Sequence, residues 1–160
     1  VGKITIPIGS TRKAGPLSMT ERAVMQRHTQ HGAQILGASP HLAMARQIAL
    51  HHHENYDGSG YPEQKRGDEI PLEARIVKVV DIYDALRTPR SYKRCLSHEG
   101  ALSTMRKGDE RTLPAHFDPK ILEAFQDEQE RVLEIYELYT EGAFLEEERR
   151  RRADERADEQ

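Results

Sequence analysis

Residues 51–62 have the sequence HHHENYDGSGYP, in which three histidines and a glutamate come directly before a glycine-rich turn. Gly58, Gly60 and Pro62 cannot extend a helix, because glycine costs backbone entropy and proline lacks the amide hydrogen. The stretch therefore marks the end of a helix whose last turn carries imidazoles. The chemistry of those imidazoles depends on what the rest of the chain brings beside them.

The helix that ends there is predicted to begin at Ser39, directly before a proline in the first helical position. His52 lies three or four residues beyond the last apolar residue of its inward stripe, so we expect His52 to point inward. His53 is rotated from it by about 100° around the helix, so the two can offer nitrogens to two neighbouring ions. The stripe comprises Leu42, Ala45, Ile48 and Ala49.

The preceding segment also places histidine near a buried face. Ser18 forms an S-x-x-E capping box with Glu21, and Gly37 is a plausible stop, so a helix is predicted between Ser18 and Gly37. Two histidines lie on or beside its buried face. Its inward stripe comprises Val24, His28, His31 or Gly32, and Ile35.

A third helix is predicted after Pro71, and it carries two carboxylates, Asp81 and Asp84, on one face beside the apolar one. Further helices are predicted to begin at Ser97 and at Asp118. No alternating run is long enough for a sheet, so the fold class is all-α. The apolar set of the third helix comprises Ile76, Val79, Val80, Tyr83 and Leu86.

The composition limits the classes of function. The 160 residues are 36% hydrophobic and 32% charged, with a formal net charge of −3, which suits one domain with a real core. The interleaved charges argue against binding a nucleic-acid polymer, and no apolar run is long enough to span a membrane. Cys95 is the single cysteine, so any metal must be held by imidazole and carboxylate, and a reducing cytoplasm is the expected location.

Four candidate ligands come from three predicted helices: His28, His52, His53 and Asp81. Imidazole and carboxylate together suit Fe, Mn, Zn or Ni, and two or three such ions side by side suit hydrolysis of a phosphate ester. Taken alone, His28 is better explained as a hydrogen-bonded core residue. Three buried histidine positions are harder to explain without a metal.

The sequence resembles a known family over residues 1–126. HHHENYDGSGYP followed by GDEIPLEARIVKVVDIYDAL is similar to the HD-GYP family, bacterial phosphodiesterases that hydrolyse cyclic di-GMP. The similarity extends upstream through VGKITIP, AGPLSMTE and VMQRHTQHGAQIL, and downstream through HFDPKILEAF. It implies an HD-domain-like helical bundle, with residues 127–160 as a C-terminal helical extension and charged tail.

The resemblance also implies roles for single residues. The histidine of M-x-x-H-x-x-x-G, the two histidines of HHE and the first aspartate of D-x-Y-D-A-L are metal ligands in the family, and they match His28, His52, His53 and Asp81. The lysine of H-D-x-G-K matches Lys3, which would bind a substrate phosphate oxygen or the attacking hydroxide. His31 and His51 are expected to stay outside the ligand set, and Asp84 to orient the glycine-rich loop or a helix end.

Substrate contacts are implied for Tyr61 and for the loop RTPRSYK, where Arg90 and Lys93 match the family's R-P-x-K segment. Ser91 departs from that segment, because proline is usual there. The H-D pair itself would fall immediately before Val1, and VGKITIP has neither an initiator methionine nor a signal peptide. We therefore expect an N-terminally truncated domain that holds part of its ligand set.

The expected function is metal-dependent hydrolysis of cyclic di-GMP to pGpG or GMP, with two or three divalent ions, Fe or Mn first and Zn or Ni as alternatives. The alternative function is a degenerate module that binds nucleotide or a partner protein without turnover. A phosphohydrolase of mononucleotides is disfavoured, because such enzymes lack the GYP stretch. Expected partners are an upstream sensory or receiver domain and a second copy through the long last helix, although Glu128 and Gly142 break its heptad pattern.

Overall fold

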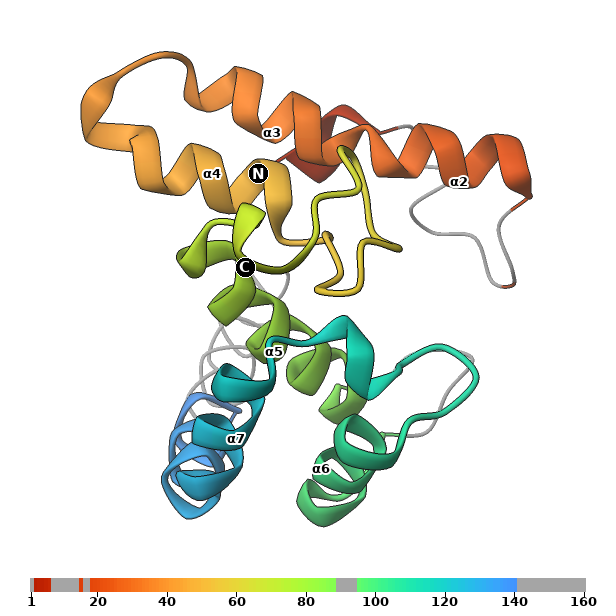
Figure 1. Cartoon of the computed structure of the whole chain (residues 1–160), viewed down its shortest axis with the longest axis vertical. Coiled ribbons are helices and arrows are strands. Elements are labelled where there is room, and N and C mark those ends of the chain that lie inside the picture. The colour runs from red at the N-terminus through yellow and green to blue at the C-terminus, as the bar shows by residue number, and fades with distance from the viewer. Residues whose placement is uncertain (1, 7–14, 16–17, 89–94, 141–160) are drawn as a thin grey trace, which may run out of the picture. The chain divides into compact units, whose positions relative to one another are not determined.

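The computed structural model describes residues 2–6, 15, 18–88 and 95–140. Within these ranges every regular element is helical (Figure 1), which confirms the all-α prediction. The chain divides into two compact units, Val1–Glu123 and Ala124–Gln160. The predicted boundary after residue 126 stays a prediction. No helix in the described part of the chain has the length and apolar character needed to cross a membrane.

The predicted helix between Ser18 and Gly37 is interrupted, so the prediction of one continuous helix is wrong. The structure has α2, Met19–Gln26, and α3, His28–Leu36, with the predicted capping box at Ser18 present. Gly37 follows α3 with a φ of 66°, as expected for a glycine that ends a helix.

The interruption at Arg27 has a local cause. The ring of His28 donates a hydrogen bond of 2.6 Å to the carbonyl oxygen of Met25. The hydroxyl of Thr29 donates one of 3.0 Å to the carbonyl oxygen of Gln26. Side chains that bond to carbonyls three residues earlier compete with the main-chain ladder of the helix. The same competition fixes the His28 ring at the first position of α3.

A short 3-10 helix, η1 (Gly2–Thr5), packs against α3. A Cβ atom on Gly2 would overlap the carbonyl oxygen of His28 and lie 2.7 Å from the amide nitrogen of Gly32. Only glycine therefore permits this approach, which brings Lys3 beside the start of α3. The hydroxyl of Thr5 and Nδ1 of His31 form an exposed hydrogen bond of 2.7 Å, so the ring of His31 has a partner at the surface.

The next helix begins as a 3-10 turn, η2 (Pro40–Leu42), and continues as α4 (Ala43–His51). Helices α3 and α4 lie side by side as a hairpin (Figure 1). The predicted inward position of Leu42 is wrong, because its side chain is 41% exposed and belongs to the 3-10 turn. His52 caps the end of α4, where the predicted stripe placed it.

The glycine-rich loop after α4 folds back on itself and is held by main-chain hydrogen bonds. The amide of Tyr61 donates to the carbonyl of His53 at 3.3 Å, and the amide of Tyr56 donates to the carbonyl of His116 at 3.0 Å. A Cβ atom on Gly60 would overlap the amide nitrogen of Asn55. Glycine at this position is thus required for the loop to close against its own start.

A 3-10 turn, η3 (Gly67–Glu69), leads into α5 (Leu72–Arg87), the longest helix of the first unit. Burial of Val79, Tyr83 and Leu86 confirms three of the predicted core positions. Ile76 and Val80 were also predicted to be buried, and these two predictions are wrong, since the residues are 46% and 49% exposed. Ala74 and Lys78, one turn apart, are buried in their place.

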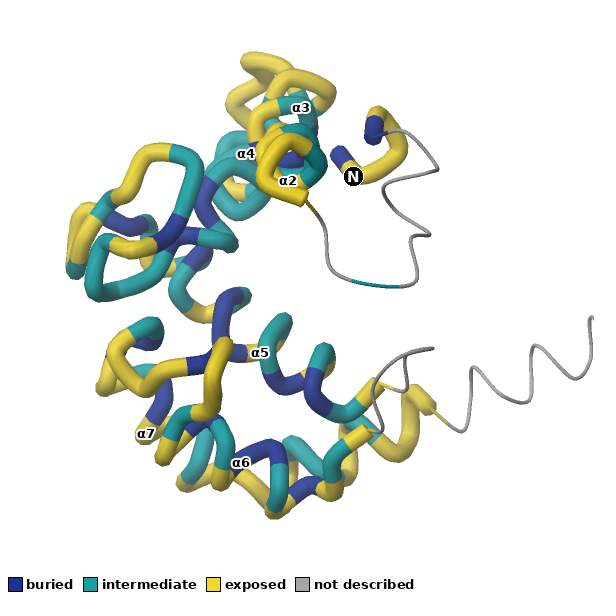
Figure 2. The backbone as a smooth tube through the Cα atoms, turned by 90° about the vertical axis from the view of Figure 1, so that its right-hand side faces the viewer, coloured by how far each residue is buried: buried dark blue, intermediate teal, exposed yellow. Residues whose placement is uncertain are grey.

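Two further helices are α6 (His98–Lys107) and α7 (Pro119–Asp127), separated by the 3-10 turn η4 (Pro114–His116). Ser97 caps α6 as predicted, accepting from the amide of Gly100 at 3.1 Å. Buried residues recur along α5 and α6 (Figure 2), which pack together. A turn at residue 128 separates α7 from a helix over 129–140, so the predicted last helix is two segments.

Candidate metal centre

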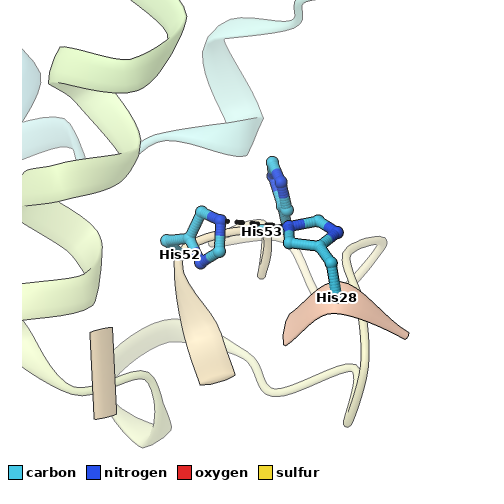
Figure 3. A group of neighbouring side chains, drawn as sticks. All are labelled: His28, His52 and His53. Carbon is cyan, nitrogen blue, oxygen red and sulfur yellow. Dashed lines mark hydrogen bonds between the residues drawn. The ribbon is translucent and has the colours of Figure 1, made fainter. Parts of the chain in front are cut away.

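Three of the predicted ligands meet in the first unit. His28 is the first residue of α3, while His52 and His53 directly follow α4. One ring nitrogen from each lies within 4.8 Å of the other two, and the rings converge on one small region (Figure 3). His28 is buried and the other two are half-buried. We call His28, His52 and His53 the histidine cluster.

Hydrogen bonds settle which nitrogens of the cluster are free. A carbonyl oxygen can only accept, so Nδ1 of His28 must carry the proton that it donates to Met25 at 2.6 Å. Nδ1 of His52 likewise donates to the carbonyl of Ile48 at 3.0 Å. In the neutral rings both Nε2 atoms therefore carry lone pairs, and they lie 3.4 Å apart.

Two facing lone pairs repel unless a cation lies between them. A separation of 3.4 Å lets one ion approach both nitrogens at the usual imidazole distance of about 2.1 Å. Histidine ligands in proteins commonly donate their second ring nitrogen to a backbone carbonyl, as His28 and His52 do here. The donor set of the cluster thus fits a divalent transition-metal ion.

The cluster is also in the protonation state that a metal requires. Burial lowers the pKa of His28 and of His52, although a backbone hydrogen bond opposes the change in each. Burial, and after it the neighbouring charges of His52 and Lys78, lower the pKa of His53 to about 2. All three rings are therefore neutral at pH 7, with lone pairs available for a metal.

Asp81 lies on α5 and is half-buried. Its carboxylate is outside the group whose donor atoms lie within 4.8 Å of one another among the described residues. Its charge nevertheless raises the pKa of both His28 and His52, and that of Tyr61. Asp81 therefore supplies negative charge to the cluster, and its role as a metal ligand remains a prediction.

The predicted substrate residues lie at two edges of the cluster. Lys3 borders a cavity of about 380 Å³ that His28 and His52 also line. The ring centroid of Tyr61 is 4.9 Å from that of His53 and 6.5 Å from that of His28. Burial, and then the charge of Asp81, raise the pKa of Tyr61, so its hydroxyl stays protonated. The predicted residues Arg90 and Lys93 lie outside the described part of the chain.

With this geometry in hand, the chain can be compared with known proteins. The HD domain family matches residues 1–121. This chain belongs to the HD domain family. A cyclic di-GMP phosphodiesterase of Vibrio cholerae is 40% identical over 150 residues, which cover 89% of this chain and 30% of that protein.

Two further relatives of this HD domain are similar at the same level. A 3′3′-cGAMP-specific phosphodiesterase 2 of Vibrio cholerae is 41% identical over 125 residues, 77% of this chain and 23% of that protein. The cyclic di-GMP phosphodiesterase response regulator RpfG of Xanthomonas campestris is 42% identical over 126 residues, 78% of this chain and 32% of that protein. The resemblance drawn from the motifs is confirmed, and the chain spans about a third or less of these relatives.

Two buried charged residues of this HD domain received no role from the sequence. Glu54 is 2% exposed, and its Oε1 accepts from the amide of Glu63 at 2.7 Å. Its Oε2 is buried with no hydrogen-bond partner among the described residues. Lys78, one turn before Asp81, is 7% exposed. The signal in the sequence was spacing alone: Lys78 comes four residues after Ala74, which puts both on one face of the helix.

The extra histidine of the HHHE run has a different environment. His51 is 4% exposed and contacts the carbonyl of Gln47 at 3.1 Å through Nδ1. Its Nε2 lies 3.2 Å from the carboxylate of Glu63, which also pairs with Lys65 at 3.0 Å. Both ring nitrogens of His51 are thus occupied within the loop, away from the histidine cluster.

Proposed function

We propose that this HD domain is a metal-dependent phosphodiesterase that hydrolyses cyclic di-GMP to linear pGpG, and onward to GMP. The observation that carries the proposal is the pair of Nε2 lone pairs of His28 and His52, 3.4 Å apart. The names of the relatives from Vibrio cholerae and Xanthomonas campestris support the substrate. The chain would thereby end a cyclic dinucleotide signal.

The metal ligands in this proposal are His28, His52, His53 and Asp81. They would hold two or three divalent ions, with Fe or Mn preferred and Zn or Ni as alternatives, since imidazole and carboxylate accept all four. Such ions, when bound, activate a water for attack on phosphorus and offset the charge that develops on the phosphate. The neutral state of the three rings supports this use.

The remaining residues would act on the phosphodiester itself. Lys3, beside His28 at the cavity, would bind a phosphate oxygen, with Arg90 and Lys93 as further cations and Tyr61 as a contact. One water is consumed: its oxygen bonds to phosphorus, the bond from phosphorus to the 3′ oxygen breaks, and that oxygen takes a proton. The ring opens to a linear dinucleotide.

A second substrate has a specific observation in its favour. One of the relatives described above is named for 3′3′-cGAMP, at an identity equal to that of the relatives named for cyclic di-GMP. The two dinucleotides differ in one base and share the phosphodiester ring, so the same cluster could act on both. A module that binds nucleotide without turnover is less favoured, because the chain retains the cluster intact.

The test joins metal analysis to turnover. The purified protein is analysed for metal content, and its hydrolysis of cyclic di-GMP and of 3′3′-cGAMP is followed by separating the products. His52→Ala should lose metal, and turnover should fall by more than about 100-fold. The exposed His41 provides the matched control, since His41→Ala removes an imidazole that is not part of the histidine cluster. Unchanged metal and turnover in His52→Ala would refute the proposal.

We also propose a cellular setting for this HD domain. A cytoplasmic location agrees with the single cysteine, Cys95, which is exposed and free. An upstream sensory or receiver domain agrees with the response regulator among the relatives. A homodimer through the helix over 129–140 agrees with the exposure of Ile135, Leu138 and Tyr139.

A further inference from the structure

A second cavity, of about 390 Å³, lies between the glycine-rich loop and the junction of α2 with α3. We call it the loop cavity. Its lining is rich in hydrogen-bonding side chains, whereas the cavity beside Lys3 is lined largely by aliphatic residues. The polar residues of the loop cavity are Gln26, Arg27 and Gln30 from the helices, and Ser59, Tyr61 and Gln64 from the loop.

The loop cavity adjoins the histidine cluster through Tyr61. This residue lines the cavity, and its ring centroid is 4.9 Å from that of His53, with the two rings inclined at 31°. A phosphodiester held at the cluster would therefore have its ribose and base within reach of the cavity. Ligand pockets commonly measure about 300–1,000 Å³, so this volume suits one nucleoside better than a whole cyclic dinucleotide.

The interruption between α2 and α3 determines where Arg27 lies. The backward hydrogen bond of His28 fixes that ring in the cluster, and Arg27, the residue before it, is left at the loop cavity. Arg27 is exposed, and its guanidinium makes no hydrogen bond or ion pair within the part of the chain that the structure describes. It is therefore available to a ligand.

The glutamines of the cavity are available in the same way. Within the described ranges, the side-chain amides of Gln26, Gln30 and Gln64 make no hydrogen bond. Gln64 also has a φ of 56°, which is uncommon for a residue other than glycine. Such backbone conformations occur preferentially where a ligand is held. The cavity thus offers one planar cation and three groups that can both donate and accept.

This set of donors matches the edge of a guanine. Guanine presents O6 and N7 side by side as acceptors, and the fork of an arginine donates to both at once. Adenine has an amino group in the place of O6, so the same fork would meet a donor there. Glutamine amides can accept from the amino and imino groups on the other edge of guanine and donate to its remaining acceptors.

We propose that the loop cavity binds a guanine base of the substrate, with the guanidinium of Arg27 donating to O6 and N7 and the glutamines meeting the rest of the base. This inference rests on the proposed function, because the cyclic dinucleotide supplies the base. Cyclic di-GMP and 3′3′-cGAMP each contain a guanine, so one such subsite serves both. Arg27 is then the residue that selects against cyclic dinucleotides without guanine.

The test uses GMP and AMP as probes, because they share the ribose and phosphate and differ in the base. Arg27→Lys keeps the charge and removes the fork, and Arg27→Met removes both. The control is Arg46→Met, which removes an arginine that bonds to the carbonyl of Gly37 at 3.1 Å and does not line the cavity. Metal content and melting temperature are measured first, and each nucleotide is then titrated into the Mn²⁺-loaded proteins by calorimetry.

The wild type should bind GMP about tenfold more tightly than AMP, in the lower part of the range for a bidentate contact between arginine and guanine. Arg27→Lys and Arg27→Met should lose this preference, and Arg46→Met should keep it. Equal affinity of the wild type for GMP and AMP would overturn the inference. So would a loss of affinity for both nucleotides by one factor in Arg27→Met, since Arg27 would then contact the phosphate.

Turnover separates this inference from the proposed function. KM for cyclic di-GMP should rise by a similar factor in Arg27→Lys, while Arg46→Met behaves as the wild type. A wild type that hydrolyses cyclic di-GMP without preferring GMP to AMP would overturn the inference and leave the proposed function standing. Absence of metal and turnover from the wild type would count against the proposed function, and the comparison of GMP with AMP would still decide the inference.

Discussion

Gly60→Ala offers a sharp test of the loop that carries the histidine cluster. A Cβ atom there would overlap the amide nitrogen of Asn55, and the Cα and carbonyl carbon of Glu54 crowd the same space. All three neighbours are backbone atoms, so none can rotate away. The loop has to open next to His53, the residue before Glu54. We expect a destabilisation near the upper end of the range of about 1–3 kcal/mol for overpacking.

The matched control is Gly58→Ala in the same loop. Gly58 has a φ of 83°, which disfavours alanine, but its Cβ would meet nothing closer than 3.5 Å. The cost there is about 1–2 kcal/mol from the dihedral alone, with no displacement of His53. The two substitutions should therefore lower the free energy of unfolding by similar amounts, whereas only Gly60→Ala should displace His53 and weaken metal binding.

Calorimetry and metal analysis together separate the two variants. Gly60→Ala should melt about 10 °C below the wild type, at the few degrees per kcal/mol typical of a domain of this size, and should lose metal. Gly58→Ala should melt less than that below the wild type and keep its metal. A Gly60→Ala protein with wild-type melting and full metal content would show that the loop does not close as the structure has it.

Four further outcomes follow from the same structure. In metal-free protein, burial lowers the pKa of His28, His52 and His53 below 6.5, so the unfolded chain takes up protons at a higher pH than the folded chain does. The free energy of unfolding, measured by urea titration, should therefore be full above pH 6.5 and decline below it, by at most about 1.4 kcal/mol per pH unit for each histidine. Chelators should lower the melting temperature of loaded protein. Asp118→Asn should cost about 3 kcal/mol in urea unfolding, because it breaks a buried pair of 2.6 Å with an arginine. Tyr83→Phe should cost about 1–3 kcal/mol in the same assay, since it removes a buried bond of 2.7 Å.

The sequence predicted the parts of this fold that depend on local rules. The capping residues Ser18 and Ser97 and the stop at Gly37 follow from side-chain and dihedral preferences that act within a few residues. The convergence of His28 with His52 followed from the apolar stripes on which both lie, and His53 adjoins His52. Periodicity sufficed there because α3 and α4 form a simple hairpin.

What the sequence did not predict depends on contacts between distant segments. Ile76 and Val80 continue an apolar pattern, yet α5 turns Ala74 and Lys78 inward, and nothing local distinguishes these two choices. The interruption at Arg27 required knowing that the ring of His28 would bond backward to a carbonyl. The interruption at Arg27 concerns the cluster, which agrees with the general finding that local rules fail most often at functional sites.

The histidine cluster shows why folding and ligand binding are linked in this domain. Burial keeps three imidazoles neutral, and two of their lone pairs lie 3.4 Å apart. Glu54, the residue after His53, has a buried carboxylate oxygen without a hydrogen-bond partner among the described residues. Each of these features costs free energy in the empty protein, and a cation at the cluster would relieve the repulsion between the lone pairs. Metal binding at the cluster should therefore raise the stability of the folded domain, so its melting temperature should report on occupancy of the cluster by ions.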